Sequence, residues 1–445
     1  MTIKQFKDEP LAHYSYAIVS EGEMALIDPS RNPLQYYAYA EAQNAKIVAV
    51  FETHPHADFV SGHLQIHQET GATIYVSKLV GVDYPHTPFD EGDEVKIGKI
   101  SIRPLHTPGH SPDSLTFVAE ENGQISLFTG DTLFIGNVGR PDLREKAGNM
   151  KAKRIELAKA MYHTMQTKFN DLPDGALVYP AHGAGSLCGK NMSDAASSTL
   201  GNERVGNWAF QTQTEDEFVQ EILKDQPFIP SYFGFNVDVN RNGAASVQQS
   251  KYNVPLKLLV SSVDDDAIVV DVRDGDQYKK GHLPNSINIM ARSDSDKYET
   301  WLGAIIKPEE PFYIVVASVK DIETILERTA KIGYEKQLKG IVTPAENLKV
   351  HSHEFDLGVF KRHPENYTIV DIRNESETAE GLLFDSALPV PLNELRERAN
   401  EIPKDKPVVV HCAGGYRSTA GSSILENHIK DVKVYDLSEA IKDFS

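Results

Sequence analysis

Cysteine is scarce in this chain of 445 residues, which contains only Cys188 and Cys412. Two thiols so far apart in the sequence exclude a disulfide framework and favour a reducing compartment. The sequence also lacks any apolar run long enough to cross a bilayer, and its first residues contain no apolar segment of signal-peptide length. We therefore expect a soluble, cytoplasmic protein that does not associate with membranes.

Basic residues are in deficit as well. The chain has 45 Lys and Arg against 64 Asp and Glu, which gives a net charge of −19. A field of this sign repels nucleic acid and acidic membrane surfaces, so a nucleic-acid partner is excluded. The 40% hydrophobic content supports packed cores, and the length indicates two or three domains. We also expect the chain to form a homo-oligomer.

The first notable motif is Thr53-His54-Pro55-His56-Ala57-Asp58, which directly follows the apolar, β-branched run 46–51. Such a run predicts a buried strand, and the motif would then lie in the loop at its C-terminal end. Imidazoles suit iron, copper and zinc, while a carboxylate can bind the metal or orient a ring. The motif therefore predicts a metal site; the alternative is a polar loop that is rich in histidine by chance.

Further metal-ligand types follow later predicted strands, in Thr107-Pro108-Gly109-His110, Thr129-Gly130-Asp131 and Ala181-His182-Gly183. Four such pieces in this order resemble the metallo-β-lactamase superfamily over about the first 185 residues. The resemblance implies an αβ/βα sandwich with the metal at the strand ends.

Phe59 distinguishes two branches of that family. Hydrolases of the glyoxalase II type carry a histidine here that binds a second metal, whereas phenylalanine has no donor atom. The persulfide dioxygenase branch implies one Fe(II) per chain, bound by His54, His110 and Asp131, with positions open for O₂ and a low-molecular-weight thiol persulfide. His56, Asp58 and His182 would orient the ligands or donate to bound species.

Two other residues near these motifs have open roles. Arg140 could grip the carboxylate of a substrate thiol, or it could form a structural salt bridge with Asp142, which we favour. Cys188 lies in a loop of small residues after His182, where it could relay sulfane sulfur. The alternative for Cys188, an incidental loop cysteine, is the one we favour.

The second half of the chain contains a repeat. An apolar strand ending in Asp271-x-Arg273 recurs one hundred residues later as a strand ending in Asp371-x-Arg373. Each is followed by a helix-like stretch and a short apolar segment, which predicts two small parallel α/β domains. We refer to them as the first and second copy.

The second copy contains the loop Cys412-Ala413-Gly414-Gly415-Tyr416-Arg417-Ser418, between a predicted strand and a predicted helix. Backbone N–H groups in such a loop can surround one anion and stabilise a thiolate or persulfide. The loop and the Asp-x-Arg strand resemble the rhodanese family, which implies Cys412 and Arg417 as catalytic residues and Gly414, Gly415, Tyr416 and Ser418 as substrate-binding residues. The alternatives are a buried, inert cysteine and a tyrosine-phosphatase-like loop, whose arginine would stand one position further from its cysteine. The first copy has no cysteine.

Together these features predict an α/β protein with a metallo-β-lactamase-like domain at 1–245, which ends at a linker over 240–246, and rhodanese-like domains at 246–350 and 351–445. The combination resembles persulfide dioxygenase–rhodanese fusions. It implies oxidation of a thiol persulfide to sulfite, and sulfur transfer by Cys412 to sulfite, giving thiosulfate in sulfide detoxification. The alternative is a glyoxalase II-like thioester hydrolase fused to a rhodanese.

Overall fold

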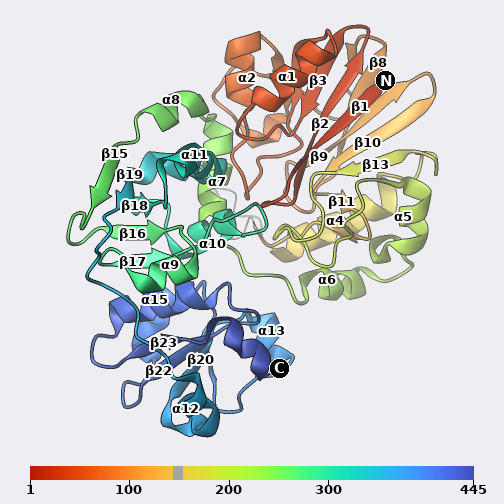
Figure 1. Cartoon of the computed structure of the whole chain (residues 1–445). Coiled ribbons are helices and arrows are strands. Elements are labelled where there is room, and N and C mark those ends of the chain that lie inside the picture. Colours follow the sequence, from red (N-terminus) through yellow and green to blue (C-terminus); the bar gives the residue numbers. More distant parts are fainter. Residues whose placement is uncertain (144–153, 445) are drawn as a thin grey trace. The chain divides into compact units, whose positions relative to one another are not determined.

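The computed structural model describes residues 1–143 and 154–444. The chain forms two compact units, one of Met1–Ser250 with Ala330–Gly333 and one of Lys251–Thr329 with Tyr334–Ser445 (Figure 1). No helix within the described ranges combines the length and apolar character needed to cross a bilayer.

The first sheet of the first unit has six strands in the order of the sequence. They are β1 (Thr2–Asp8), β2 (His13–Ser20), β3 (Glu23–Ile27), β4 (Lys46–Phe51), β5 (Thr73–Val76) and β6 (Thr87–Pro88). Strands β1 to β3 pair antiparallel, and β3 to β6 pair parallel. The parallel connections carry α1 (Leu34–Ala42) and α2 (His63–Thr70), which lie on one side of this sheet (Figure 1).

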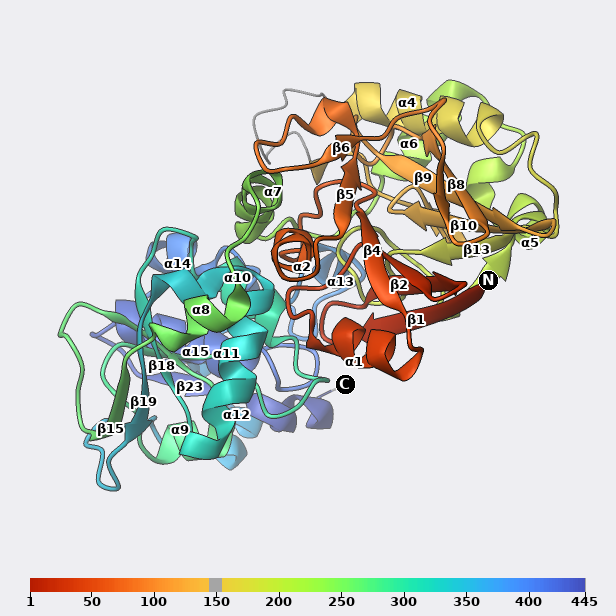
Figure 2. The same cartoon turned by 90° about the horizontal axis from the view of Figure 1, so that it is seen from above.

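The second sheet also has six strands, in the order β14-β13-β10-β9-β8-β7. These are β7 (Val95–Ile97), β8 (Ile100–His106), β9 (Leu115–Glu121), β10 (Gln124–Gly130), β13 (Leu177–Pro180) and β14 (Ser198–Thr199). β11 (Leu133–Phe134) and β12 (Asn137–Val138) form a hairpin after β10. Helices α4 (Arg154–Thr167), α5 (Leu200–Gly206) and α6 (Glu215–Leu223) accompany this sheet (Figure 2).

Three apolar clusters establish the layers of this unit. The central cluster joins the facing sides of the two sheets through Ile18, Phe51, Ile102, Phe117 and Phe128. A second cluster packs α1 and α2 on the other side of the first sheet, and a third packs α4 and α6 on the other side of the second. Since side chains alternate between the faces of a strand, each sheet is covered on both sides. The expected αβ/βα sandwich is confirmed.

The linker expected over 240–246 is wrong in its first part, because α7 (Tyr232–Asn242) extends into it. Asn240 is buried, and its amide bonds to the loop after β4. The polar composition of this stretch suggested exposed backbone, but the amide instead satisfies buried polar groups. Helix α8 (Val247–Tyr252) follows.

The second unit contains two parallel sheets. The five-stranded sheet has the order β15-β19-β18-β16-β17, from β15 (Leu256–Val260), β16 (Ile268–Asp271), β17 (Ser286–Asn288), β18 (Phe312–Val315) and β19 (Leu338–Pro344). The four-stranded sheet has the order β21-β20-β22-β23, from β20 (Thr368–Asp371), β21 (Leu388–Pro389), β22 (Val408–His411) and β23 (Val434–Asp436). The helices are α9 (Gly275–Lys280), α10 (Tyr298–Ile305), α11 (Ile322–Lys331), α12 (Leu357–Arg362), α13 (Glu375–Ala379), α14 (Leu395–Arg398) and α15 (Ser418–His428).

The two Asp-x-Arg strands form matching contacts, which we call the arginine clips. In each, the arginine side chain is bound to the aspartate two residues earlier, and its Nη2 donates to a glycine carbonyl at 2.8 Å, Gly281 in the first copy and Gly381 in the second. Each clip connects the end of an interior strand, β16 or β20, to the segment that follows the next helix. The sequence repeat is therefore also a structural repeat.

Candidate functional site

The three predicted metal ligands meet at the ends of three strands in the first unit. His54 follows β4, His110 follows β8 and Asp131 follows β10. All three are buried, and their donor atoms lie within 4.8 Å of one another. The Nε2 atoms of His54 and His110 lie 3.9 and 3.4 Å from Oδ2 of Asp131.

Hydrogen bonds on the opposite ring nitrogens orient both imidazoles. Nδ1 of His110 lies 2.9 Å from the carbonyl oxygen of Arg140, to which it donates. The Thr53 hydroxyl donates to Asp28, so it accepts from Nδ1 of His54 at 3.0 Å. Both Nε2 atoms are thus left as acceptors that face Asp131, which is how proteins commonly fix metal-binding histidines.

The carboxylate of Asp131 fits a metal ion. Both of its oxygens are buried and accept no hydrogen bond from the described part of the chain. A buried carboxylate without hydrogen bonds is costly unless a cation compensates it. Two imidazoles and one carboxylate suit a non-haem Fe(II) ion. These residues form a candidate metal-binding site.

His56, Asp58 and His182 surround this site. Nε2 of His182 lies 3.5 Å from Asp58 and 3.5 Å from Asp131, whereas Nε2 of His56 lies 3.3 Å from Asp28. Burial disfavours the charged imidazole, but Asp131 and Asp58 outweigh it and raise the pKa of His182 to about 9. Burial likewise opposes ionisation of Asp58, but His182, His56 and His13 lower its pKa to about 2. The carboxylates of Asp58 and Asp131 therefore stabilise positively charged groups in this site.

Phe59 closes one side of the site without offering a donor. Its ring is buried and lies 3.9 Å from the ring of His13 and 4.5 Å from that of His56, measured between centroids. Sequence analysis did not identify His13, which begins β2 and gives no motif signal. Burial lowers the pKa of His13 well below its usual value, so its ring stays neutral.

Asp28 and Asn240 were also missed, although both support the loop after β4. Asp28 accepts from the backbone and hydroxyl of Thr53 at 2.8 and 2.9 Å. Asp28 follows β3, which pairs parallel to β4, and this position could have indicated that Asp28 lies near the loop after β4. Asn240 donates to the carbonyls of His56 and Phe59 and accepts from the Ser61 amide, each at 2.8 Å. Its distance in sequence from the loop hid this role.

Arg140 forms the salt bridge that we favoured. Its guanidinium donates to both oxygens of Asp142 at 2.6 and 2.7 Å and to the Leu187 carbonyl at 3.1 Å. The side chain is buried, so these partners account for its charge. Its carbonyl also orients His110. A direct contact between Arg140 and substrate stays a prediction.

Cys188 lies closer to the metal site than a loop position alone would suggest. Its Sγ, the Asp58 carboxylate and the His182 ring nitrogen lie within 4.8 Å of one another. The thiol is buried, and burial raises its pKa well above the usual value. In this state the sulfur is a protonated thiol. A sulfur-relay role is not tested by this geometry.

The second copy holds the predicted Cys412 loop between β22 and α15. The Gly415 amide donates to Sγ of Cys412 at 3.1 Å. Gly415 has φ +97°, and a Cβ there would come within 2.7 Å of backbone after β23, so this turn requires glycine. The Ser418 hydroxyl donates to the Gly415 carbonyl, and the Tyr416 hydroxyl donates to the Met290 carbonyl of the first copy, both at 3.0 Å.

Arg417 is held by a carboxylate. It donates to both oxygens of Glu377, on α13, at 2.6 and 2.7 Å. Beside the loop is a cavity of about 560 Å³ that Gly414, Gly415 and Tyr416 line together with first-copy residues such as Lys279 and Arg292. The loop is therefore accessible to a small molecule even though Cys412 itself is buried.

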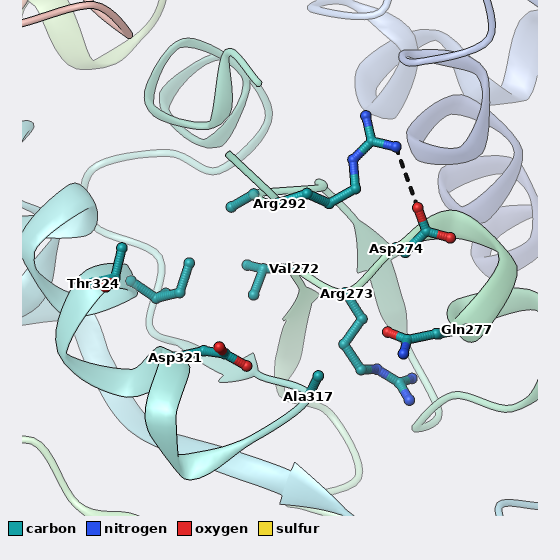
Figure 3. Close-up of a pocket in the computed structure, with 10 residues that line it drawn as sticks. Val272, Arg273, Asp274, Gln277, Arg292, Ala317, Asp321 and Thr324 are labelled. Carbon is teal, nitrogen blue, oxygen red and sulfur yellow. Dashed lines mark hydrogen bonds and ion pairs between the residues drawn. The ribbon is translucent and has the colours of Figure 1, made fainter. Parts of the chain in front are cut away.

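The first copy has a loop of the same length, from Val316 to Asp321, between β18 and α11. Counted from the strand end, Val316 stands where Cys412 does, and Asp321 stands where Arg417 does. Figure 3 shows Asp321, Ala317, Gln277 and Arg292 around a cavity of about 360 Å³, with Arg292 paired to Asp274. The first copy has thus lost the nucleophile and reversed the charge beside it.

Two family models match the chain. One, described as the metallo-beta-lactamase superfamily, matches residues 8–182. The other, described as a rhodanese-like domain, matches residues 256–339 and again 357–445. The tandem rhodanese-like organisation predicted from the repeat is confirmed.

Similar proteins include enzymes of both expected branches. The mitochondrial persulfide dioxygenase ETHE1 of Mus musculus is 32% identical over 232 residues, which cover 51% of this chain and 80% of the relative. The cytoplasmic hydroxyacylglutathione hydrolase of Arabidopsis thaliana is 30% identical, covering 49% and 83%. A crystal structure of a metallo-beta-lactamase from Staphylococcus aureus is 30% identical with a TM-score of 0.66, covering 77% of this chain and 99% of that one.

These relationships confirm the expected enzyme class, with a sulfur dioxygenase-type domain and sulfurtransferase-type domains. The fold, the cluster of histidines and aspartates at the strand ends, and the relatives agree with one another. The chain therefore belongs to the metallo-β-lactamase superfamily, as a relative of the persulfide dioxygenases that is fused to tandem rhodanese-like domains.

Proposed function

We propose that the first unit oxidises a low-molecular-weight thiol persulfide with O₂, using one Fe(II) per chain held by His54, His110 and Asp131. The balanced reaction converts persulfide, O₂ and water into free thiol, sulfite and two protons. Bound iron would supply the redox chemistry between O₂ and sulfane sulfur. The observation that carries this proposal is Phe59, which packs against His13 and His56 where a second metal would need a ligand.

The protein's own side chains prepare this site. His54 and His110 are fixed by Thr53 and the Arg140 carbonyl, so that only Nε2 of each is offered. His182 lies between Asp58 and Asp131, where it can hold a proton near the reacting sulfur. Burial of all these groups excludes bulk water and strengthens their electrostatic effect on bound substrate.

We propose that Cys412 then transfers sulfane sulfur. Its thiolate attacks a persulfide, forms enzyme persulfide and releases the substrate thiolate. Sulfite attacks the outer sulfur of this enzyme persulfide, which gives thiosulfate, one proton and regenerated thiolate. The Gly415 amide supports the charge on sulfur. The reverse order, with Cys412 supplying sulfur to the iron site, uses the same residues.

This pair of activities would remove sulfide-derived persulfides, a detoxification role for a cytoplasmic enzyme. A homo-oligomeric assembly and three domains bounded at 245 and 350 stay predictions. The competing function is a thioester hydrolase fused to a rhodanese, which the Arabidopsis thaliana relative supports at nearly equal identity. Metal content and O₂ consumption separate the two functions.

The first test is O₂ uptake by the iron-loaded protein with glutathione persulfide or coenzyme A persulfide. We expect about one iron per chain, O₂ consumption and sulfite formation, with only trace hydrolysis of lactoylglutathione. Replacing iron by redox-silent zinc should abolish O₂ uptake, because the ligand set remains but electron transfer does not. Full activity of the zinc form, or rapid lactoylglutathione hydrolysis without O₂ uptake, would reject the dioxygenase.

The second test is the product of the Cys412→Ser variant. We expect it to consume O₂ at the wild-type rate but to accumulate sulfite in place of thiosulfate, because hydroxyl cannot carry sulfane sulfur. Ion chromatography of the products measures this ratio. Val316→Ala changes the corresponding position of the first copy and should leave the ratio unchanged. Unaltered thiosulfate from Cys412→Ser would exclude the proposed transfer.

A further inference from the structure

The cavity of the first copy lies where the second copy has an ion pair. Gln277 stands one hundred positions before Glu377, and Asp321 is the counterpart of Arg417. Arg417 and Glu377 bond to each other at 2.6 and 2.7 Å, whereas the described side chains of Gln277 and Asp321 form no such bond and line the cavity of about 360 Å³. Other lining residues follow β16 and β18, so the cavity lies beyond the carboxyl ends of these strands, where parallel sheets commonly bind ligands.

The side chains on two sides of this cavity offer hydrogen-bond acceptors. Asp321 is half-buried; one of its oxygens accepts from the Ser318 amide at 3.0 Å, and its carboxylate forms no ion pair with a described residue. The side-chain oxygens of Gln277 and Thr324 accept no hydrogen bond from the part of the chain that the structure describes. Figure 3 shows Asp321 and Gln277 pointing into the cavity from opposite sides. An ammonium group has three N–H donors and a positive charge, so it matches these acceptors.

Two guanidinium groups also line the cavity, and one of them can bind an anion. The charge of Arg273 is matched by the buried Asp271. Arg292 is fixed by Asp296, to which its Nε and Nη2 donate at 3.0 and 2.9 Å. Its Nη1 donates to Asp274 at 3.2 Å, and both of these side chains are nearly half exposed. Exposed ion pairs contribute little, so a ligand carboxylate can take the place of Asp274.

We propose that this cavity binds a zwitterionic small molecule, with its ammonium group at Asp321 and its carboxylate at Arg292. An α-amino-acid group carries this pair of charges, and glutathione has one in its γ-glutamyl part. The apolar lining residues Val272, Ala291 and Ile325 contact the carbon chain. The volume lies within the range of about 300–1,000 Å³ that is usual for small-molecule sites.

The site binds its ligand without chemistry, because Val316 stands where the second copy has Cys412. The choice of a thiol such as glutathione rests on the proposed function, whereas the charge pattern of the ligand rests on the cavity alone. Binding here needs neither iron, O₂ nor Cys412. The O₂ uptake assay and a binding assay can therefore fail independently of each other.

The test is equilibrium dialysis of the full-length protein with S-methylglutathione, whose blocked sulfur takes no part in oxidation or sulfur transfer. We expect wild type to bind about one equivalent more than Asp321→Asn, because the amide lacks the charge that holds the ammonium group. The asparagine oxygen can still accept from the Ser318 amide, so the variant keeps its turn. Asp266→Asn should bind as wild type does, since Asp266 is exposed and precedes β16, at the opposite end of that strand from the cavity.

A second probe, N-acetyl-S-methylglutathione, keeps the carboxylates but has no ammonium group. We expect wild type and Asp321→Asn to bind it equally, with the extra equivalent of wild type absent. Denaturant titration of the variants shows whether both retain the wild-type fold. Equal binding of S-methylglutathione by wild type and Asp321→Asn, or an extra equivalent of the acetylated probe in wild type, would each overturn the proposal.

Discussion

Asn240 connects α7 to the loop that carries His54, His56 and Asp58. Three of its hydrogen bonds reach His56, Phe59 and Ser61, each at 2.8 Å. Asn240→Ala leaves two buried carbonyls and one buried amide unsatisfied. We expect the free energy of unfolding to fall by about 2–4 kcal/mol, with weaker metal binding.

Chemical denaturation and metal titration measure the two effects of Asn240→Ala. Asn242→Ala is the matched control, because Asn242 ends the same helix with an exposed side chain. Equal stability of the two variants would show that the loop does not depend on Asn240.

The metal-ligand candidates were predictable because each lies within four residues after the end of a strand and the type of side chain carries the chemistry. Their assignment as ligands stays a prediction, although the structure brings His54, His110 and Asp131 together. Asn240 was not predictable because an asparagine gives no signal of its partner, 184 residues away at His56. His13 was missed for the same reason, since only tertiary packing gives it a role, whereas the position of Asp28 directly after β3 offered a signal.

At the scale of elements, α15 combines the active loop at its N-terminus with an unusual carboxyl near its C-terminus. Burial and the nearby Asp436 raise the pKa of Glu426 from 4.5 to about 7. The folded state thus binds this proton more tightly than the unfolded chain does. The resulting stabilisation is complete below pH 4.5 and is lost as the pH rises through about 7.

Glu426→Gln removes the cost of ionising this half-buried carboxyl. We expect the variant to gain up to about 3 kcal/mol over wild type at pH 8 and much less at pH 5. Denaturant titrations at the two pH values measure the difference. Glu380→Gln, which removes one exposed carboxylate, should show no such pH dependence. A uniform effect of Glu426→Gln at both pH values would contradict this explanation.

The buried strand after α1 was predicted better than the end of the first domain. The apolar run 46–51 became β4 with the same limits, because burial on both faces leaves a continuous apolar signal. The polar stretch 240–246 instead gave part of α7, because the hydrogen bonds of Asn240 compensate its burial. The sequence also predicts a long helix over about 149–169; α4 covers Arg154–Thr167 of it, and the expected start lies outside the described residues.

At the scale of the whole molecule, one chain carries both proposed reactions. Because both sites belong to one chain, the product of one site meets the other site at a higher effective concentration than it would with separate chains. We therefore expect a mixture of full-length His110→Ala and Cys412→Ser chains to form less thiosulfate per sulfite than wild type at low protein concentration. The gap should narrow as the protein concentration rises.

Product ratios over a dilution series measure this effect. Wild type should keep a constant ratio over the same range, and each variant alone should form little thiosulfate. A mixture that matches wild type at every dilution would show that the fusion gives no kinetic advantage.

Because the two copies share the arginine clip and the loop length, the loop of the first copy can be replaced by the Cys412 loop of the second copy. In both copies the arginine holds the end of the Asp-x-Arg strand against a glycine carbonyl. Only the second copy has a nucleophile after the neighbouring strand. The stretch from Val316 to Ile322 could therefore be exchanged for that from Cys412 to Ser418 without changing the chain length. The sulfurtransferase activity of this variant would show whether the loop alone is sufficient to make the first copy active.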